Sequence, residues 1–294
     1  MGKKISVQSQ TAPLELHSDH HPQVFGKTLI WNLDKDNGAS KSGNKLAKGL
    51  EMEAFAIAQK INEGKIDSGM LQELPHGEQN KFIAAIEKYL NPKQTLEMHY
   101  ARNGSHEFGN LTFTCKNASA PAPVSTEDRQ LQAAVSKLQK KYDANEATRG
   151  QVLFGLGVGP DGKKRLLVNV HAESNKSTYV NKNGVTVKRI NLEEVMKEVD
   201  AVSKKHNVGF VVGGDMNAGE HQLPKDLGSA INSPNFRYQH SAKNSSFRRD
   251  GTAVNVDAII STDKTTPLKT FSEMNCCDEA FIKKFDEVKK KQNK

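Results

Sequence analysis

The feature that most constrains the fold is a short apolar run at residues 210–212, followed by two glycines, Asp215 and Asn217. The run is β-branched, too short for a helix and closed by glycines, so it predicts a buried strand. Residues two apart on a strand point to the same face, so we expect Asp215 and Asn217 to share one. Such a pair can activate a water molecule and hold a phosphate oxygen. An Asx turn that merely ends the strand is an equally open interpretation.

Helices and strands alternate along the rest of the chain. Helical periodicity predicts helices at residues 45–63, 79–90, 131–142, 192–202 and 277–291. Short apolar runs predict strands at residues 28–32, 66–74, 108–115, 151–159, 165–171 and 253–260. This alternation, with hairpins mixed in, predicts an α/β sandwich rather than a purely parallel sheet. We expect a single domain over residues 14–291, with a flexible segment at residues 1–13.

The composition of the chain bears on its expected cellular location. The chain has 294 residues, 36% of them hydrophobic, which is enough to fill a core. It has no long apolar stretch and no secretory leader pattern, and its three cysteines lack metal-ligand spacing. We therefore expect a monomer without a transmembrane segment. It would be cytoplasmic, or exported by a route other than Sec, as a bacterial effector can be.

The charge of the chain favours polyanionic partners. Its formal net charge is +8 and its pI is about 9.2. A basic balance of this kind is typical of proteins that bind nucleic acid, nucleotides or anionic lipid headgroups. Much of the excess lies in lysine clusters that are often only solvated helix faces, so the charge alone is a weak filter.

Polar residues recur where the predicted strands end. They are Asn32, Glu73, His171, Asp215 with Asn217, and Asp257. Each could be an ordinary turn residue. Together they predict one shared cleft, because α/β folds place their sites at the carboxyl ends of strands.

In its ordered motifs the sequence resembles the endonuclease/exonuclease/phosphatase superfamily. The motifs lie at residues 30–33, 71–74, 108–111, 168–171, 214–217 and 256–259. The resemblance implies a four-layer α/β/β/α sandwich with mixed sheets and a metal-dependent phosphoesterase activity. One motif is out of place, because the superfamily's Ser-Asp-His-x-Pro normally follows the position of Asp257. Here the only match is Ser18 to Pro22, before the first strand.

We interpret this displacement as a circular permutation. The superfamily's last strand runs away from the site and its first strand runs back, and two antiparallel neighbours can be joined by a tight turn. Residues 20–32 leave room for both. The alternative is that the Ser-Asp-His-His-Pro pattern arose by chance.

The resemblance implies a site for Mg²⁺, with Mn²⁺ as the alternative cation. Glu73 would be the main ligand, with Asn32 and Asp19 nearby. Hard cations of this kind take oxygen ligands and keep several waters. Asn32 could instead only cap its strand.

The resemblance also implies catalytic roles. Asp215 would orient or deprotonate the attacking water, Asn217 would hold the phosphoryl group, and His171 would donate to a phosphate oxygen. His20 would lie at the scissile phosphate, with Asp257 fixing its imidazole. His171 could instead be a packed strand histidine, and Asp257 a strand cap.

Arginines supply candidate substrate contacts. Arg248 and Arg249 precede Asp257 and could bind substrate phosphates, since arginine matches phosphate geometry, although exposed arginines are often only solvated. Arg102 and Tyr100 are weaker candidates of the same sort. The basic charge favours a Mg²⁺-dependent phosphodiesterase that acts as a nuclease on DNA or RNA. The alternatives are a phosphoinositide- or sphingomyelin-type phosphoesterase and a non-catalytic phosphate-binding module.

Overall fold

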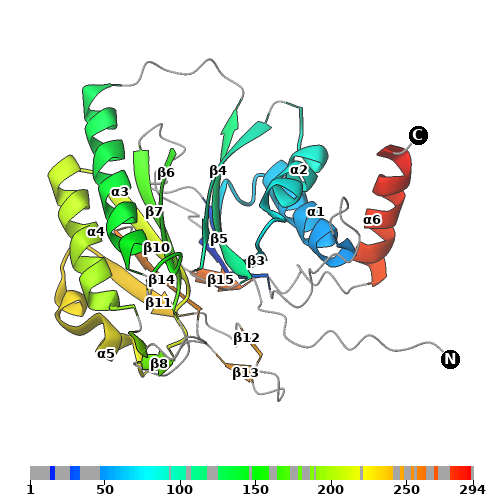
Figure 1. The fold of residues 1–294 in the computed structure, drawn as a ribbon. Coiled ribbons are helices and arrows are strands. Elements are labelled where there is room, and N and C mark those ends of the chain that lie inside the picture. Colours follow the sequence, from blue (N-terminus) through cyan, green and yellow to red (C-terminus); the bar gives the residue numbers. More distant parts are fainter. Residues whose placement is uncertain are drawn as a thin grey trace.

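The structure is a computed structural model. It describes residues 14–16, 27–33, 47–92, 94–103, 107–117, 125–145, 148–158, 164–172, 178–180, 186–188, 190–218, 221–240, 246–247, 253–254, 257–262, 268–270 and 279–292. Two mixed sheets lie face to face, and helices cover the outer face of each (Figure 1). This is the predicted α/β/β/α sandwich.

The first sheet contains the described strands from the N-terminal half of the chain and one from near its end. They are β1 (Leu14–Leu16), β2 (Thr28–Asn32), β3 (Ser68–Pro75), β4 (Gln94–Arg102), β5 (Phe108–Asn117) and β15 (Leu268–Thr270). Their order across the sheet is β15-β1-β2-β3-β5-β4. β2 and β3 are parallel, while the other neighbours are antiparallel.

The second sheet contains strands from the C-terminal half. They are β6 (Val152–Val158), β7 (Lys164–His171), β10 (Gly209–Asp215), β11 (Arg237–His240) and β14 (Asp257–Ser261). Their order is β11-β14-β10-β7-β6, and β7 and β10 are its parallel pair. Two small hairpins join β8 (Thr178–Val180) to β9 (Thr186–Lys188) and β12 (Ser246–Phe247) to β13 (Ala253–Val254).

Helices form the two outer layers. Those on the first sheet are α1 (Lys48–Asn62), α2 (Gln79–Tyr89) and α6 (Glu279–Gln292). Those on the second sheet are α3 (Thr126–Ala144), α4 (Leu192–His206) and α5 (Leu223–Leu227), followed by the 3₁₀ helix η2 (Gly228–Asn232). No helix in the described part of the chain is long and apolar enough to cross a membrane.

Local sequence explains where several helices begin and end. Ser125 accepts a hydrogen bond from the Asp128 amide, and the Asp128 carboxylate accepts one from the Ser125 amide, which completes a capping box at the start of α3. Gly64, with φ +65°, follows the end of α1, as the sequence predicted. These signals lie within a few residues of each helix end.

A small apolar cluster lies between the two sheets. Ile30 and Met70 from the first sheet pack against Leu167, Val211 and Ile259 from the second. A Cβ atom added to Gly213 would lie 2.2 Å from Cδ1 of Ile30, so glycine at this position allows the sheets to approach. The glycine that marked the end of the predicted strand is therefore a packing requirement.

The sequence missed β4, the edge strand of the first sheet. Its apolar residues Leu96, Met98 and Tyr100 alternate with polar ones, which is the period of a strand with one solvated face. No continuous apolar run marks it, so no element was predicted between the helix at 79–90 and the strand at 108–115.

The strand pairing next to β2 bears on the predicted permutation. β1 runs antiparallel to β2, with Leu14 opposite Ile30 and Glu15 opposite Leu29. β1 precedes the Ser-Asp-His-His-Pro motif, whereas the sequence placed the antiparallel neighbour after it. The motif itself lies outside the described residues, so the circular permutation stays a prediction, as does the single domain over residues 14–291.

Candidate active site

Four predicted strand-end residues meet at one edge of the sandwich. Asn32 ends β2, Glu73 lies near the end of β3, and His171 and Asp215 end β7 and β10. Nδ2 of Asn32 donates to Oε1 of Glu73 at 3.3 Å and to Oδ2 of Asp215 at 3.1 Å. The amide therefore joins carboxylates that come from different sheets.

A β-bulge sets the direction of Glu73. The register between β3 and β5 shifts between Leu71 and Leu74, and Glu73 has φ +58°. A left-handed backbone is uncommon for a glutamate and costs free energy, so the surrounding structure must hold it. Bulges re-aim side chains, and this one brings the Glu73 carboxylate to Asn32.

Asp215 is the most enclosed carboxylate of the group, with only 5% of its surface exposed. Its Oδ1 accepts a hydrogen bond from the Asn217 backbone amide at 2.8 Å, and its Oδ2 accepts the bond from Asn32. Burial raises the pKa of Asp215 above its usual value, and these hydrogen bonds and nearby His171 only partly oppose that shift. The neutral form of this carboxyl is therefore favoured more than in water.

His171 lies beside the carboxylates and is buried. Its Nε2 is 3.5 Å from Oε1 of Glu73, which is an ion pair when the imidazole is protonated. Its ring contacts the Phe108 ring, with centroids 5.6 Å apart. Nδ1 is buried and has no hydrogen-bond partner among the described residues. Packing against Phe108 thus holds the ring beside Glu73.

Asn217 does not share a strand face with Asp215, contrary to the sequence-based expectation. β10 ends at Asp215, and Asn217 lies beyond it with φ +46°. Its amide hydrogen bond to the Asp215 side chain makes an Asx turn, and its Nδ2 donates to the Ala172 carbonyl at 2.5 Å. The Asx turn is present, and Asp215 also accepts the hydrogen bond from Asn32. An Asx turn at the strand end and a functional role for Asp215 are therefore compatible.

The other predicted site residues are placed only in part. The backbone of Asp257 starts β14 and is in register with Asp215, so it lies at the same edge of the sheet. Asp19, His20, Arg248 and Arg249 lie outside the described residues. Their roles stay predictions.

A buried polar bridge that the sequence did not predict lies directly behind the site. Nε2 of Gln72 donates to Oδ1 of Asn169 at 2.7 Å, and Nδ2 of Asn169 donates to the carbonyls of Leu71 and Leu111 at 2.9 and 3.0 Å. Both side chains are fully buried. An asparagine between Val168 and Val170 in an apolar strand was the available signal, since a buried amide needs partners.

The residues present fit a hard divalent cation bound mainly through water. Within the described ranges, no three His, Cys, Asp or Glu side chains are close enough to hold a metal ion. Mg²⁺, however, often uses only one or two protein carboxylates. Glu73 and Asp215 approach the same Asn32 amide, and this pair of oxygen donors would favour a cation between them. Glu73 and Asn32 are thus suitable ligands.

Comparisons with known proteins found similarity only among solved structures. No protein-family model and no curated protein matches the sequence. Truncated TDP2 of Caenorhabditis elegans matches with a TM-score of 0.47 and 12% identity, over 80% of this chain and 82% of that one. The human Nocturnin catalytic domain matches with a TM-score of 0.46 and 12% identity, over 87% and 90%.

A third similar structure carries the name of the superfamily that the motifs resemble. It is an endonuclease/exonuclease/phosphatase family protein from Leptotrichia buccalis C-1013-b. Its TM-score is 0.41 and its identity 11%, over 72% of this chain and 82% of that one. Identities this low carry no information about substrate.

Proposed function

We propose that this protein is a Mg²⁺-dependent phosphodiesterase that hydrolyses nucleic acid. One observation supports this most directly: Asn32, Glu73, His171 and Asp215 meet at one edge although they come from four strands and two sheets. Carboxylates, an amide and an imidazole within contact distance form a set that can bind a cation, activate water and stabilise a phosphate.

Each residue has a role that suits its surroundings. Asp215 would accept the proton of the attacking water, and its raised pKa makes it a stronger base than an exposed aspartate. His171 would donate to a non-bridging phosphate oxygen, and Asn217 would orient the phosphoryl group. Glu73 and Asn32 would hold the cation, which when bound neutralises charge on the phosphate.

The N-terminal motif would complete this site. We propose that His20 stabilises the scissile phosphate or acts as an acid, with Asp257 as the carboxylate that orients its ring and Asp19 near the cation. Arg248 and Arg249 would bind flanking phosphates. The net charge of +8 supports nucleic acid as the substrate class, since phosphodiester chains are dense polyanions.

A panel of substrates with and without chelator tests the activity. We expect hydrolysis of bis(p-nitrophenyl) phosphate, of labelled single-stranded DNA and of RNA, its loss with EDTA and its return with Mg²⁺. Little hydrolysis is expected for p-nitrophenyl phosphate, phosphoinositides or sphingomyelin. Activity on the lipids alone would change the substrate class, and binding of oligonucleotides without turnover would indicate a non-catalytic module.

Two variants at the site and one control variant assign the activity to the site. Glu73→Gln and Asp215→Asn should each lower kcat by about 100-fold or more, which is typical of removing a group that acts in the transition state. Glu107→Gln removes an exposed carboxylate and should retain activity. If Glu73→Gln and Glu107→Gln behaved alike, the site would be misassigned.

The predicted permutation has its own matched pair. His20→Ala should lose activity, whereas His21→Ala, one residue further on, should keep it. Equal activity of the two variants would leave the hydrolase intact and remove the N-terminal motif from its mechanism.

A further inference from the structure

Asn110, a fully buried residue of β5, lies between the two sheets beside the candidate active site. Leu111 and Phe113 belong to the apolar core on the helix-covered face of the first sheet. Because side chains alternate along a strand, Asn110 and Phe108 point to the other face, toward the second sheet. A buried amide needs hydrogen-bond partners, and those of Asn110 lie at the start of the second sheet.

The hydrogen bonds of Asn110 reach the backbone just before β6. Its Nδ2 donates to the Gly150 carbonyl at 2.9 Å and to the Gln151 carbonyl at 3.3 Å. The Gln151 carbonyl also accepts a hydrogen bond from the backbone amide of His171 at 2.8 Å. One carbonyl oxygen is therefore shared by Asn110 and by the strand end that carries His171.

The position of the His171 ring depends strongly on its backbone. Its buried Nδ1 has no hydrogen-bond partner among the described residues, and its Nε2 lies 3.5 Å from Glu73. The ring packs on Phe108, with centroids 5.6 Å apart. β5 thus acts on His171 twice, because Phe108 contacts the ring and Asn110 bonds to the carbonyl that holds the His171 amide.

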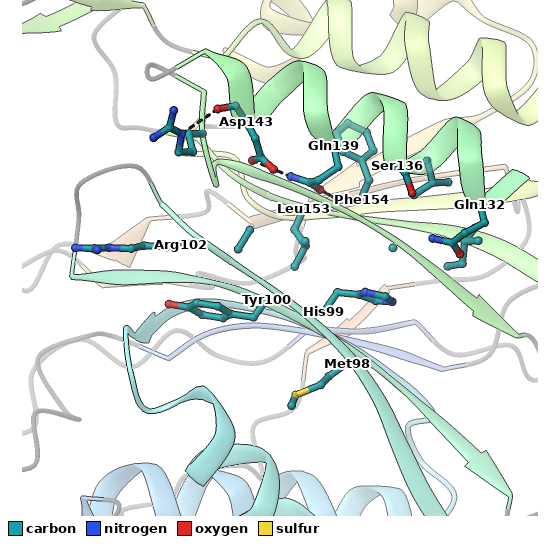
Figure 2. A pocket seen from close by; sticks show the side chains of 15 residues that line it. Met98, His99, Tyr100, Arg102, Gln132, Ser136, Gln139, Asp143, Leu153 and Phe154 are labelled. Carbon is teal, nitrogen blue, oxygen red and sulfur yellow. Dashed lines mark hydrogen bonds between the residues drawn. The ribbon is translucent and has the colours of Figure 1, made fainter. Parts of the chain in front are cut away.

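The segment that Asn110 holds borders a hollow on its other side. Arg149 lines a pocket of about 650 Å³ whose walls come from β4, α3 and β6 (Figure 2). Its Nε donates to the Asp143 carbonyl of α3 at 2.9 Å. Because the pocket side offers little packing, the bonds from Asn110 are suited to fixing the Gln151 carbonyl from the inner side.

We infer that Asn110 is a positioning residue for His171. By fixing the Gln151 carbonyl, it sets where the end of β7 lies and keeps Nε2 of His171 beside Glu73. These two residues come from different sheets, so their distance depends on links between the sheets such as this one. The inference rests on the proposed function, in which His171 donates to a phosphate oxygen. A misplacement of about 1 Å at such a contact can lower a rate about 100-fold.

A double-mutant cycle on the hydrolysis of bis(p-nitrophenyl) phosphate tests this inference. Asn110→Ala should lower kcat by about 10- to 100-fold in the otherwise unmodified protein, but by less than about two-fold when His171 is already alanine. Residues that act as one unit show this non-additivity. Equal losses in both backgrounds would indicate a merely structural role and would overturn the inference.

Asn62→Ala is the matched control for the cycle. The Nδ2 of Asn62 also donates to a backbone carbonyl, that of Tyr89 at 2.8 Å, but this bond joins α1 to α2. The variant should leave kcat within about two-fold in both backgrounds. Circular dichroism checks that each protein is folded at the assay temperature. If Asn110→Ala is not, Asn110→Asp, which keeps the size of the side chain but not its amide, takes its place.

A second measurement does not require turnover. The imidazole signals of His171 in ¹H–¹⁵N spectra are those that disappear in His171→Ala. Asn110→Ala should shift these signals, whereas Asn62→Ala should not. Unchanged His171 signals in Asn110→Ala would contradict the inference. No hydrolysis by the unmodified protein would instead refute the proposed function, while the spectra would still test whether Asn110 positions His171.

Discussion

Replacing Asn169 with alanine should destabilise the protein strongly, because this side chain joins the two sheets. Its Nδ2 donates to the carbonyls of Leu71 and Leu111, and its Oδ1 accepts from Gln72. Each of these residues is fully buried, so water cannot replace the lost partner. The Gln72 amide keeps its bond to the Met70 carbonyl at 3.0 Å, which leaves two carbonyls as the main losses.

The magnitude follows from those two carbonyls. A buried group left without its partner costs about 1–3 kcal/mol, so Asn169→Ala should lower the free energy of unfolding by roughly 2–6 kcal/mol. Leu71 borders the bulge that aims Glu73, so the variant should also lose activity under conditions where it remains folded. The loss reports a positioning effect, because Asn169 lies behind the site and contacts β3 and β5 rather than the cleft side chains.

Urea unfolding followed by fluorescence of Trp31 measures this change. Asn232→Ala, at an exposed position of η2, is the matched control and should change stability by less than about 0.5 kcal/mol. A loss of less than about 1 kcal/mol in Asn169→Ala, with an unchanged m value, would refute the reasoning, since the carbonyls would then have found other partners.

Three further predictions concern single positions. Gly214→Ala should lower the free energy of unfolding by about 3 kcal/mol or more, because Gly214 has φ +140° and a Cβ atom there would lie 1.9 Å from the Val170 carbonyl. The control is Gly64→Ala, which is also at positive φ but in open space and should cost only about 1 kcal/mol. Thermal unfolding measures both. Burial raises the pKa of Asp67 to about 6, so the folded state binds its proton more tightly than the unfolded state does. The stability advantage of Asp67→Asn over the unmodified protein should therefore be absent below about pH 4, grow as pH rises and approach about 3 kcal/mol above pH 6. An advantage that shrank as pH rose would contradict this sign. Ser125→Ala should lower stability by about 1 kcal/mol through loss of the α3 cap, and an unchanged melting temperature would show that the cap is dispensable.

Local sequence determined most of the long helices and the central strands, and the edge at which the site lies. Helical periodicity predicted α1, α2 and α4, and Gly64 marked where α1 ends. Asn32 and Asp215 were identified because a polar residue closes each apolar run. Parallel strands end at a common edge, so residues at their carboxyl ends come together without any further information.

Tertiary structure decided how the side chains at that edge meet. The bulge that gives Glu73 its left-handed backbone depends on pairing with β5, and the register of that pair is set by contacts far apart in the sequence. The bond from Gln72 to Asn169 joins residues 97 positions apart. No periodicity within a single segment reports such a pairing.

A pocket between the edge strands of the two sheets was also beyond the reach of sequence. Its walls come from β4, α3 and β6, and Gly150 packs against the Arg102 backbone at the end of β4. Propensity and periodicity are local properties of the chain, whereas strand register and side-chain contacts depend on how distant segments pack. Sequence therefore determined which residues reach the edge, and packing determined which of them touch.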